Sequence, residues 1–303
     1  MRATFLIAIM LATCTGRALA GFPFTFRSSK VEIRVVDDQG KPVAKTSMGM
    51  GVTGSGKGGI ARGETDTNGM FSARLKMEGS VYLRAEKSGY YRTAGELWSG
   101  PTTTTPLPPT NQYTIVLKRI ANPVPMITRE VSLIMPRLGT PCGFDLVAGD
   151  WVAPHGTGVV ADCHILGKKV VEDYRNWDLG CRLIFTNRNG VVGFRAPGSA
   201  SYALKSDLVP PPVAPEEGYV AEYAFAHSYH AGVGSSASAD NNDHLLFRVR
   251  SETNDEGRVV SAHSGWVEGA LRLDGRNTDT MWMGFIYHLN PDPTSRSLEP
   301  LRR

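Results

Sequence analysis

Residues 246–269 read LFRVRSETNDEGRVVSAHSGWVEG, and this stretch decides the class of fold. Two runs rich in Val, Phe and Trp flank residues 254–257, NDEG, which supply the Asn, Asp and Gly that tight turns favour. β-Branched and aromatic side chains pack well on a pleated, half-buried surface, so both runs are typical of strands. The pattern therefore predicts a β-hairpin around this turn.

The same pattern of strand-like runs separated by turn residues extends over the C-terminal half of the chain. From about residue 128, strand-like runs such as REVSLIM and CRLIFTN alternate with turn residues, and RNG at 188–190 predicts a second hairpin. Residues 166–178 are compatible with a short helix or an irregular loop, and the proline-rich residues 208–218 predict a surface excursion. We expect residues 128–290 to form one β-sandwich of jelly-roll type.

Strand signals also fill residues 30–118, where three motifs resemble a known family. The motifs are VEIRVVDDQGKPVAKTSM at 31–48, GETDTNGMF at 63–71 and LRAEKSGYY at 83–91. In this order they are similar to the carboxypeptidase regulatory-like (transthyretin-like) domain family. The resemblance implies a seven-stranded Greek-key β-sandwich, used as an accessory module in secreted and surface proteins, and it implies no catalytic residue.

The two regions together predict an all-β chain, in which a transthyretin-like β-sandwich precedes a second, larger β-sandwich of jelly-roll type. The abundance of Gly and Pro (33 and 19 residues) and the lack of long helical periodicity favour this class. The expected divisions are a signal peptide at 1–20, a lead-in at 21–29, the first sandwich at 30–119, a linker at 120–127, the second sandwich at 128–290 and a flexible tail at 291–303.

The N-terminus predicts export. Arg2 precedes an apolar run at 5–12, and ALA at 18–20 has the small-x-small pattern of a signal-peptidase site. We expect a secreted or periplasmic protein with no transmembrane segment in the mature chain, because no other stretch approaches about 18 uninterrupted apolar residues. LATC, which ends at Cys14, also resembles a lipobox, so a lipid anchor on Cys14 is the alternative, although Thr13 fits that motif poorly.

Charge and spacing argue against nucleic acid and nucleotide as partners. Cleavage after residue 20 removes Arg2 and Arg17 from the 33 basic residues, which leaves 31 against 29 acidic ones and no basic cluster. GVTGSGKG at 51–58 approaches a phosphate-binding loop, but Gly58 stands where that loop needs a hydroxyl. A turn and a strand follow it, rather than the helix whose N-terminus would meet the phosphate.

Export also places the three remaining cysteines, Cys142, Cys163 and Cys181, in an oxidising compartment. We expect a disulfide between Cys142 and Cys181, and we expect Cys163, in the apolar run VVADCHI, to be a buried thiol. The sequence alone does not fix this pairing.

The segment CGFDLVAGDWVAPHGTG, residues 142–158, is the densest cluster of polar and aromatic residues. Asp145 and Asp150 could act as acid and base in glycoside hydrolysis, with His155 beside them, but Asp next to Gly is also ordinary turn chemistry. Trp151 could stack on a ligand in a groove or pack in the core. Trp98, beside a Pro/Thr-rich loop, is the other candidate for ligand binding.

His227, His230 and His244 are the candidate metal ligands. Residues i and i+3 of a strand face opposite sides, so His227 and His230 could share a metal only at a turn. Neither the H-E-x-x-H nor the C-x-x-C spacing accompanies them. DNND at 240–243 offers oxygen ligands for Ca²⁺ but lacks the Gly and the distal Glu of the calcium-binding loop. We therefore expect no metal and no cofactor.

These observations favour a secreted or envelope-associated binding or accessory protein without catalytic activity, with a glycan, a cell-envelope component or an envelope protein as its ligand. The alternatives are a secreted hydrolase that uses Asp145, Asp150 and His155, and a purely structural envelope protein. An open cleft that gathers these three side chains would favour the hydrolase, whereas separate turns would disfavour it.

Overall fold

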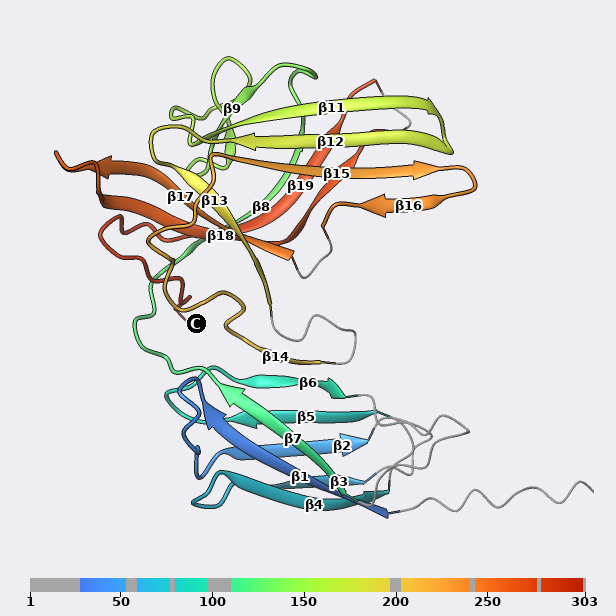
Figure 1. The fold of residues 1–303 in the computed structure, drawn as a ribbon, viewed down its shortest axis with the longest axis vertical. Helices are drawn as coiled ribbons and strands as arrows, with labels where there is room; N and C mark the ends of the chain where they lie inside the picture. The colour runs from blue at the N-terminus through green and yellow to red at the C-terminus, as the bar shows by residue number, and fades with distance from the viewer. Residues whose placement is uncertain are drawn as a thin grey trace, which may run out of the picture.

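The computed structural model describes residues 28–52, 59–76, 80–97, 110–196, 203–239, 243–276 and 279–301, and every regular element among them is a β-strand. The strands form two β-sandwiches, drawn one above the other in Figure 1. The all-β, two-sandwich fold predicted from the sequence is confirmed. In the described part of the chain, no helix has the length and apolarity to cross a bilayer.

The first sandwich pairs a three-stranded sheet with a five-stranded sheet. The three-stranded sheet has the order β4 (Met70–Lys76), β1 (Ser28–Asp37), β7 (Thr110–Leu117), with β7 parallel to β1. The five-stranded sheet has the order β14 (Leu204–Ser206), β6 (Thr93–Leu97), β5 (Val81–Glu86), β2 (Ser47–Val52), β3 (Ile60–Glu64). The first sandwich therefore takes seven strands from residues 28–117 and one strand, β14, from the second half of the chain.

Strand β1 shows how the sequence builds the core of this sandwich. Val31, Ile33 and Val35 alternate along the strand, point to one face and are fully buried. The Asp37 carboxylate accepts two backbone N–H bonds from the turn that follows, and Gly40 in that turn has a φ of +79°. The local turn chemistry thus fixes the register of the alternation that fills the core.

The second sandwich is larger. Its six-stranded sheet has the order β10 (Asp150–Trp151), β9 (Cys142–Asp145), β11 (Cys163–Asp173), β12 (Asn176–Ile184), β15 (Glu222–His230), β16 (Gly234–Ala237). Its five-stranded sheet has the order β13 (Gly190–Arg195), β17 (Asp243–Thr253), β18 (Val259–Asp274), β19 (Trp282–Leu289), β8 (Ile127–Ile134).

The hairpin predicted at 254–257 is confirmed, because β17 and β18 pair antiparallel on either side of it. The hairpin predicted at 188–190 is wrong. Strand β12 already has β11 and β15 on its two edges, so the chain crosses to the other sheet, where β13 pairs with β17. Residues 166–178 form neither a helix nor an irregular loop, since they belong to the antiparallel pair β11 and β12.

Residues 296–301, which we call the C-terminal strap, pack between the two sandwiches. The N–H of Val124, in the predicted linker, donates to the carbonyl oxygen of Glu299, and the N–H of Leu301 donates to the carbonyl oxygen of Val124, both at 2.8 Å. Leu298 is fully buried in a cluster that includes Leu246 and Trp266 of the second sandwich. The strap therefore lies against both the linker and the second sandwich.

The Glu299 carboxylate, in a residue that is 1% exposed, extends this contact to the first sandwich. Its Oε2 accepts the Tyr91 hydroxyl at 3.1 Å and the Ala121 N–H at 2.9 Å, and its Oε1 accepts the Asn122 N–H at 3.3 Å. The prediction of a flexible tail is therefore wrong for residues 291–301, because backbone donors of the linker hold the tail in place.

The proline-rich segment 208–218 is also more closely packed than a surface excursion. Leu208 and Ala214 are buried, and the N–H of Ala214 donates to the carbonyl oxygen of Arg296 at 2.8 Å. The N–H of Leu298 donates to the carbonyl oxygen of Pro212 at 2.9 Å. This segment and the C-terminal strap are therefore held together by backbone hydrogen bonds between the two sandwiches.

Replacing Leu298 with Ala should lower the free energy of unfolding by about 2–5 kcal/mol, because it leaves a cavity in a fully buried site. Urea unfolding followed by tryptophan fluorescence measures the change. Leu301→Ala is the matched control: its side chain is 56% exposed, so a change within about 0.5 kcal/mol is expected. Equal effects of the two substitutions would show that the strap does not pack as described.

Candidate functional site

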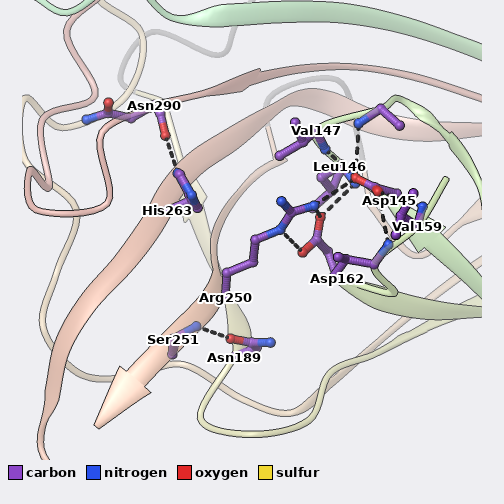
Figure 2. Close-up of polar contacts among 12 residues, drawn as sticks. Asp145, Leu146, Val147, Val159, Asp162, Asn189, Arg250, Ser251, His263 and Asn290 are labelled. Atoms are coloured by element: carbon purple, nitrogen blue, oxygen red, sulfur yellow. Dashed lines mark hydrogen bonds and ion pairs between the residues drawn. The ribbon is translucent and has the colours of Figure 1, made fainter. Parts of the chain in front are cut away.

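The Asp145 carboxylate, the first candidate catalytic group, is buried and fully engaged (Figure 2). Its Oδ1 accepts the backbone N–H groups of Val147 and Ala148 at 2.9 and 3.0 Å. Its Oδ2 accepts those of Val159 and Val160 at 3.0 and 3.1 Å. One carboxylate thus holds together two loops of the second sandwich.

Arg250 links Asp145 to a second buried carboxylate, that of Asp162. Its Nη2 lies 2.9 Å from Asp145 Oδ1 and 3.2 Å from Asp162 Oδ2, and its Nε lies 2.9 Å from Asp162 Oδ1. Arg250 has a φ of +53° and lies at an irregularity in the pairing of β17 with β18. A bulge of this kind redirects a side chain, here toward the two buried carboxylates.

These contacts decide the charge of Asp145. Burial raises the pKa of its carboxyl group, but the N–H bonds from Ala148, Val160 and Val159 and the charge of Arg250 outweigh burial, so the pKa lies below its usual value. A carboxylate that stays ionised and has its lone pairs occupied is unsuited to be a general acid.

Asp150 and His155 do not complete a catalytic pair. The Asp150 carboxylate accepts the N–H and the hydroxyl of Thr157, both at 2.8 Å, and these bonds lower its pKa. The side chain of His155 is exposed, and its backbone N–H donates to the carbonyl oxygen of Val152. Asp145 ends β9 and Asp150 begins β10, and the carboxylate of each binds backbone N–H groups of neighbouring turns, while His155 lies in the loop after β10. This is the ordinary turn chemistry that the alternative interpretation of the sequence expected.

Of the two candidate ligand-binding tryptophans, Trp98 and Trp151, the structure describes Trp151. Trp151 is 3% exposed and packs edge-on against Phe144, with ring centroids 5.4 Å apart, so it cannot stack on a ligand in this fold. Trp98 lies outside the described residues.

The candidate metal ligands are not brought together. His227 and His230 point to opposite faces of β15, where His227 contacts Ser235 and His230 contacts Asp178. His244 lies on β17, in the other sheet. Among the residues that the structure describes, no group of three His, Cys, Asp or Glu side chains could hold a metal ion.

The three cysteines are free, buried thiols. Cys142 of β9 pairs in register with Ile165 of β11, and Cys181 of β12 pairs with Gly167 of the same strand, so β11 separates the two cysteines. Two strand spacings, about 9.5 Å, exceed the roughly 7 Å limit between disulfide-bonded Cα atoms. The fold therefore does not form the expected Cys142–Cys181 disulfide, and burial raises the pKa of the Cys181 thiol to about 12.

Alkylation with a thiol reagent in denaturant, without a reductant, should therefore add three labels to the chain that begins at residue 21. Without denaturant the labelling should be slow, because the three thiols are buried. Mass spectrometry counts the labels, and a single label in denaturant would mean that two of the cysteines are paired.

A cleft of about 750 Å³ lies between the two sandwiches and is lined in part by β14. Figure 1 shows β14 lying between the strands of the two sandwiches. Strand β7 contributes Thr114, Ile115 and Val116, followed by Lys118 in its continuation, and Ile115 and Leu117 also pack in the core of the first sandwich. Strand β18 contributes Glu268, Gly269, Ala270 and Arg272. The segment from β14 to residue 209 forms a further wall.

His244 and Glu268 are polar groups of this cleft from the second sandwich. The His244 Nδ1 accepts the N–H of Gly269 at 2.9 Å, and burial lowers the pKa of the imidazole, so His244 is neutral at neutral pH. Its ring stacks on Phe194, with centroids 5.1 Å apart. The imidazole is therefore held rigidly in the cleft wall.

Lys118 holds in place the cleft wall formed by the segment that follows β14. Its ammonium group donates to the carbonyl oxygens of Leu208 and Pro210 at 2.8 and 3.1 Å. Burial lowers the pKa of Lys118, and its described hydrogen bonds are to carbonyl oxygens only. At the start of the same wall, a Cβ on Gly95 would collide with the carbonyl oxygen of Ala203, so glycine is required where β14 meets β6.

The sequence could not have identified this cleft. Its residues come from β6, β7, β14, β17, β18 and β19, and none of them forms a motif. The alternation of Glu268, Ala270 and Arg272 is what any strand with one exposed face would show.

The sequence matches no protein-family model, and no curated protein matches it. Three solved structures give weak likenesses. These are 3-chlorocatechol 1,2-dioxygenase from Rhodococcus opacus 1CP (14% identity, 31% of this chain, 60% of that chain, TM-score 0.25), a streptococcal ancillary pilin (9%, 71%, 58%, 0.24), and a DUF3823 family protein from Parabacteroides merdae ATCC 43184 (9%, 86%, 96%, 0.22). This chain spans about three fifths of the first two, and TM-scores this low support no conclusion about function.

Replacing Asp145 with Asn should lower the free energy of unfolding at pH 7 by about 2–4 kcal/mol, because Arg250 loses one of its two buried partners. The folded pKa of Asp145 is lowered, so its contribution is present above the unfolded pKa of about 3.9 and is lost as pH falls through the folded pKa. The difference between variant and wild type should therefore shrink below about pH 4.

Denaturant unfolding at a series of pH values tests this. Arg258→Gln is the control: its ion pair with Glu256 is largely exposed, so little change is expected at any pH. A difference for Asp145→Asn that grew as the pH fell would contradict the assignment.

Proposed function

We propose that this protein is an exported binding protein without catalytic activity, and that its ligand, a glycan of the cell envelope, occupies the cleft between the two sandwiches. The observation that carries the proposal is the cleft itself. It measures about 750 Å³, and its lining combines aliphatic side chains with polar and charged groups from both sandwiches. Size and lining of this kind are typical of sites for small ligands.

The chemistry of the lining favours a sugar. Val116, Ala270 and Ile286 offer aliphatic surface to the C–H face of a pyranose ring. The hydroxyl of Thr114 can donate and accept, and the carboxylate of Glu268 can accept hydrogen bonds from sugar hydroxyls. Such a mixture suits a ligand whose faces are apolar and whose rim is polar.

The state of the acidic residues favours binding over hydrolysis. Asp145 and Asp150, the carboxylates of the hydrolase alternative, accept backbone N–H groups of the turns beside their strands. Export is supported by the signal-peptide features of residues 1–20, which lie outside the described part of the chain. We accordingly place the protein outside the cytoplasm.

The test is a glycan array and a glycosidase-substrate screen on the protein that begins at residue 21, followed by calorimetry on any glycan that binds. We expect binding without turnover. Ala270→Trp should fill the cleft and weaken binding at least about tenfold, equivalent to about 1.4 kcal/mol.

Ala224→Trp is the matched control, because Ala224 is exposed on β15, a strand that does not line the cleft. Equal weakening by the two substitutions would place the glycan elsewhere. A hydrolysed substrate would support the enzyme alternative, and failure to bind any glycan would favour a purely structural role.

A further inference from the structure

We infer that the ligand of the cleft is an acidic glycan, held through its anionic groups by Lys205 and Arg272. The inference rests on the proposed function, because it specifies the kind of sugar that the same cleft binds. Its starting point is the charge of the lining: Lys118, Lys205 and Arg272 are basic, whereas Glu268 is the acidic side chain of that lining.

The neighbouring groups leave this excess of positive charge in place. Arg272 lies 3.6 Å from Glu130, a distance beyond a hydrogen bond, and both side chains are more than half exposed. No ion pair of Lys205 occurs among the described residues, and Lys118 meets carbonyl oxygens rather than a carboxylate. Lys205, and Arg272 with its exposed contact to Glu130, therefore remain available to an incoming anion, whereas the Lys118 ammonium is occupied by carbonyl oxygens.

The carboxylate of Glu268 is not neutralised by the neighbouring His288. Its carboxylate lies 3.6 Å from His288 Nε2, but burial lowers the pKa of His288, so that imidazole is largely neutral at pH 7. The acids beside the cleft are already paired, Asp207 with Arg92 at 3.1 Å and Asp243 with Arg195 at 3.3 Å. The lining thus has three basic side chains and one acidic side chain, a net charge of +2. The whole mature chain, with 31 basic and 29 acidic residues, has the same net charge, so the cleft is far more positive than the average of the chain.

The geometry suits an anionic sugar better than a small inorganic anion. The guanidinium of Arg272 lies 5.9 Å from the centre of the Trp282 ring, and this contact orients it. A guanidinium is planar and can donate two parallel hydrogen bonds to one carboxylate or sulfate. Between the cations lies the aliphatic surface of Val116 and Ile286, which an inorganic ion would leave uncovered. A sugar ring with an acidic substituent satisfies both features.

The test compares each acidic oligosaccharide with a neutral partner of the same shape: oligogalacturonides with their methyl esters, and sulfated with unsulfated oligosaccharides. Calorimetry at low salt should show at least about tenfold tighter binding of the acid, and 0.5 M NaCl should remove most of that preference. The paired arms show whether the anion is a carboxylate or a sulfate.

The double variant Lys205→Gln/Arg272→Gln should bind the acid and the neutral sugar with about equal affinity. The affinity for the neutral sugar should stay as in the wild type, because both side chains are exposed and their loss leaves the cleft walls intact. Arg258→Gln, on the exposed turn between β17 and β18, is the control and should change neither affinity. Equal binding of acid and ester by the wild type would overturn the acidic-glycan inference but leave the proposed function standing. A preference that survives the double substitution would overturn the roles of Lys205 and Arg272, and failure of every oligosaccharide to bind would overturn both proposals.

Discussion

The Glu299 carboxylate is the interaction on which the arrangement of this molecule depends. It is buried without a basic partner among its hydrogen bonds, and it accepts the hydroxyl of Tyr91 and the N–H groups of Ala121 and Asn122. A buried carboxylate is costly unless its lone pairs are occupied, so these donors and the acceptor hold one another in place. The donors lie on the first sandwich and the linker, and Leu298 next to Glu299 packs into the second sandwich, so these two residues link the two sandwiches that form the cleft.

The sequence predicted what depends on near neighbours and missed what depends on distant ones. The turn at 254–257 and the strand signals within residues 30–118 are local, and both predictions are confirmed in the part of the chain that the structure describes. The turn at 188–190 carries the same local signal, but its flanking strands belong to different sheets, since the edges of β12 were already taken. Glu299 sits in a polar, proline-containing tail, and nothing near it in sequence shows that its partners lie at residues 91–122.

The acidic cluster around Asp145 illustrates the same limit for sites. Two carboxylates near a tryptophan and a histidine have the composition of a hydrolase centre, and they equally have the composition of a network that ties loops to strands. The difference lies in the donors: backbone N–H groups and Arg250 fill the lone pairs of Asp145. Such donors are invisible in a sequence because every residue except proline supplies an N–H. The cleft, conversely, has no compositional signature, since its residues come singly or in short runs from several strands and one connecting segment.

The late position of β14 in the chain has a consequence for biogenesis. The chain crosses a membrane or leaves the ribosome from its N-terminus, so strands β1 to β7 are available well before residues 204–206 arrive. During that interval the edge of β6, with Gly95 at its centre, offers unpaired N–H and C=O groups. An uncovered edge is a template for pairing with another chain. The first sandwich is therefore most exposed to misassembly between molecules at this stage of synthesis, and the covering of β6 by β14 ends that vulnerability.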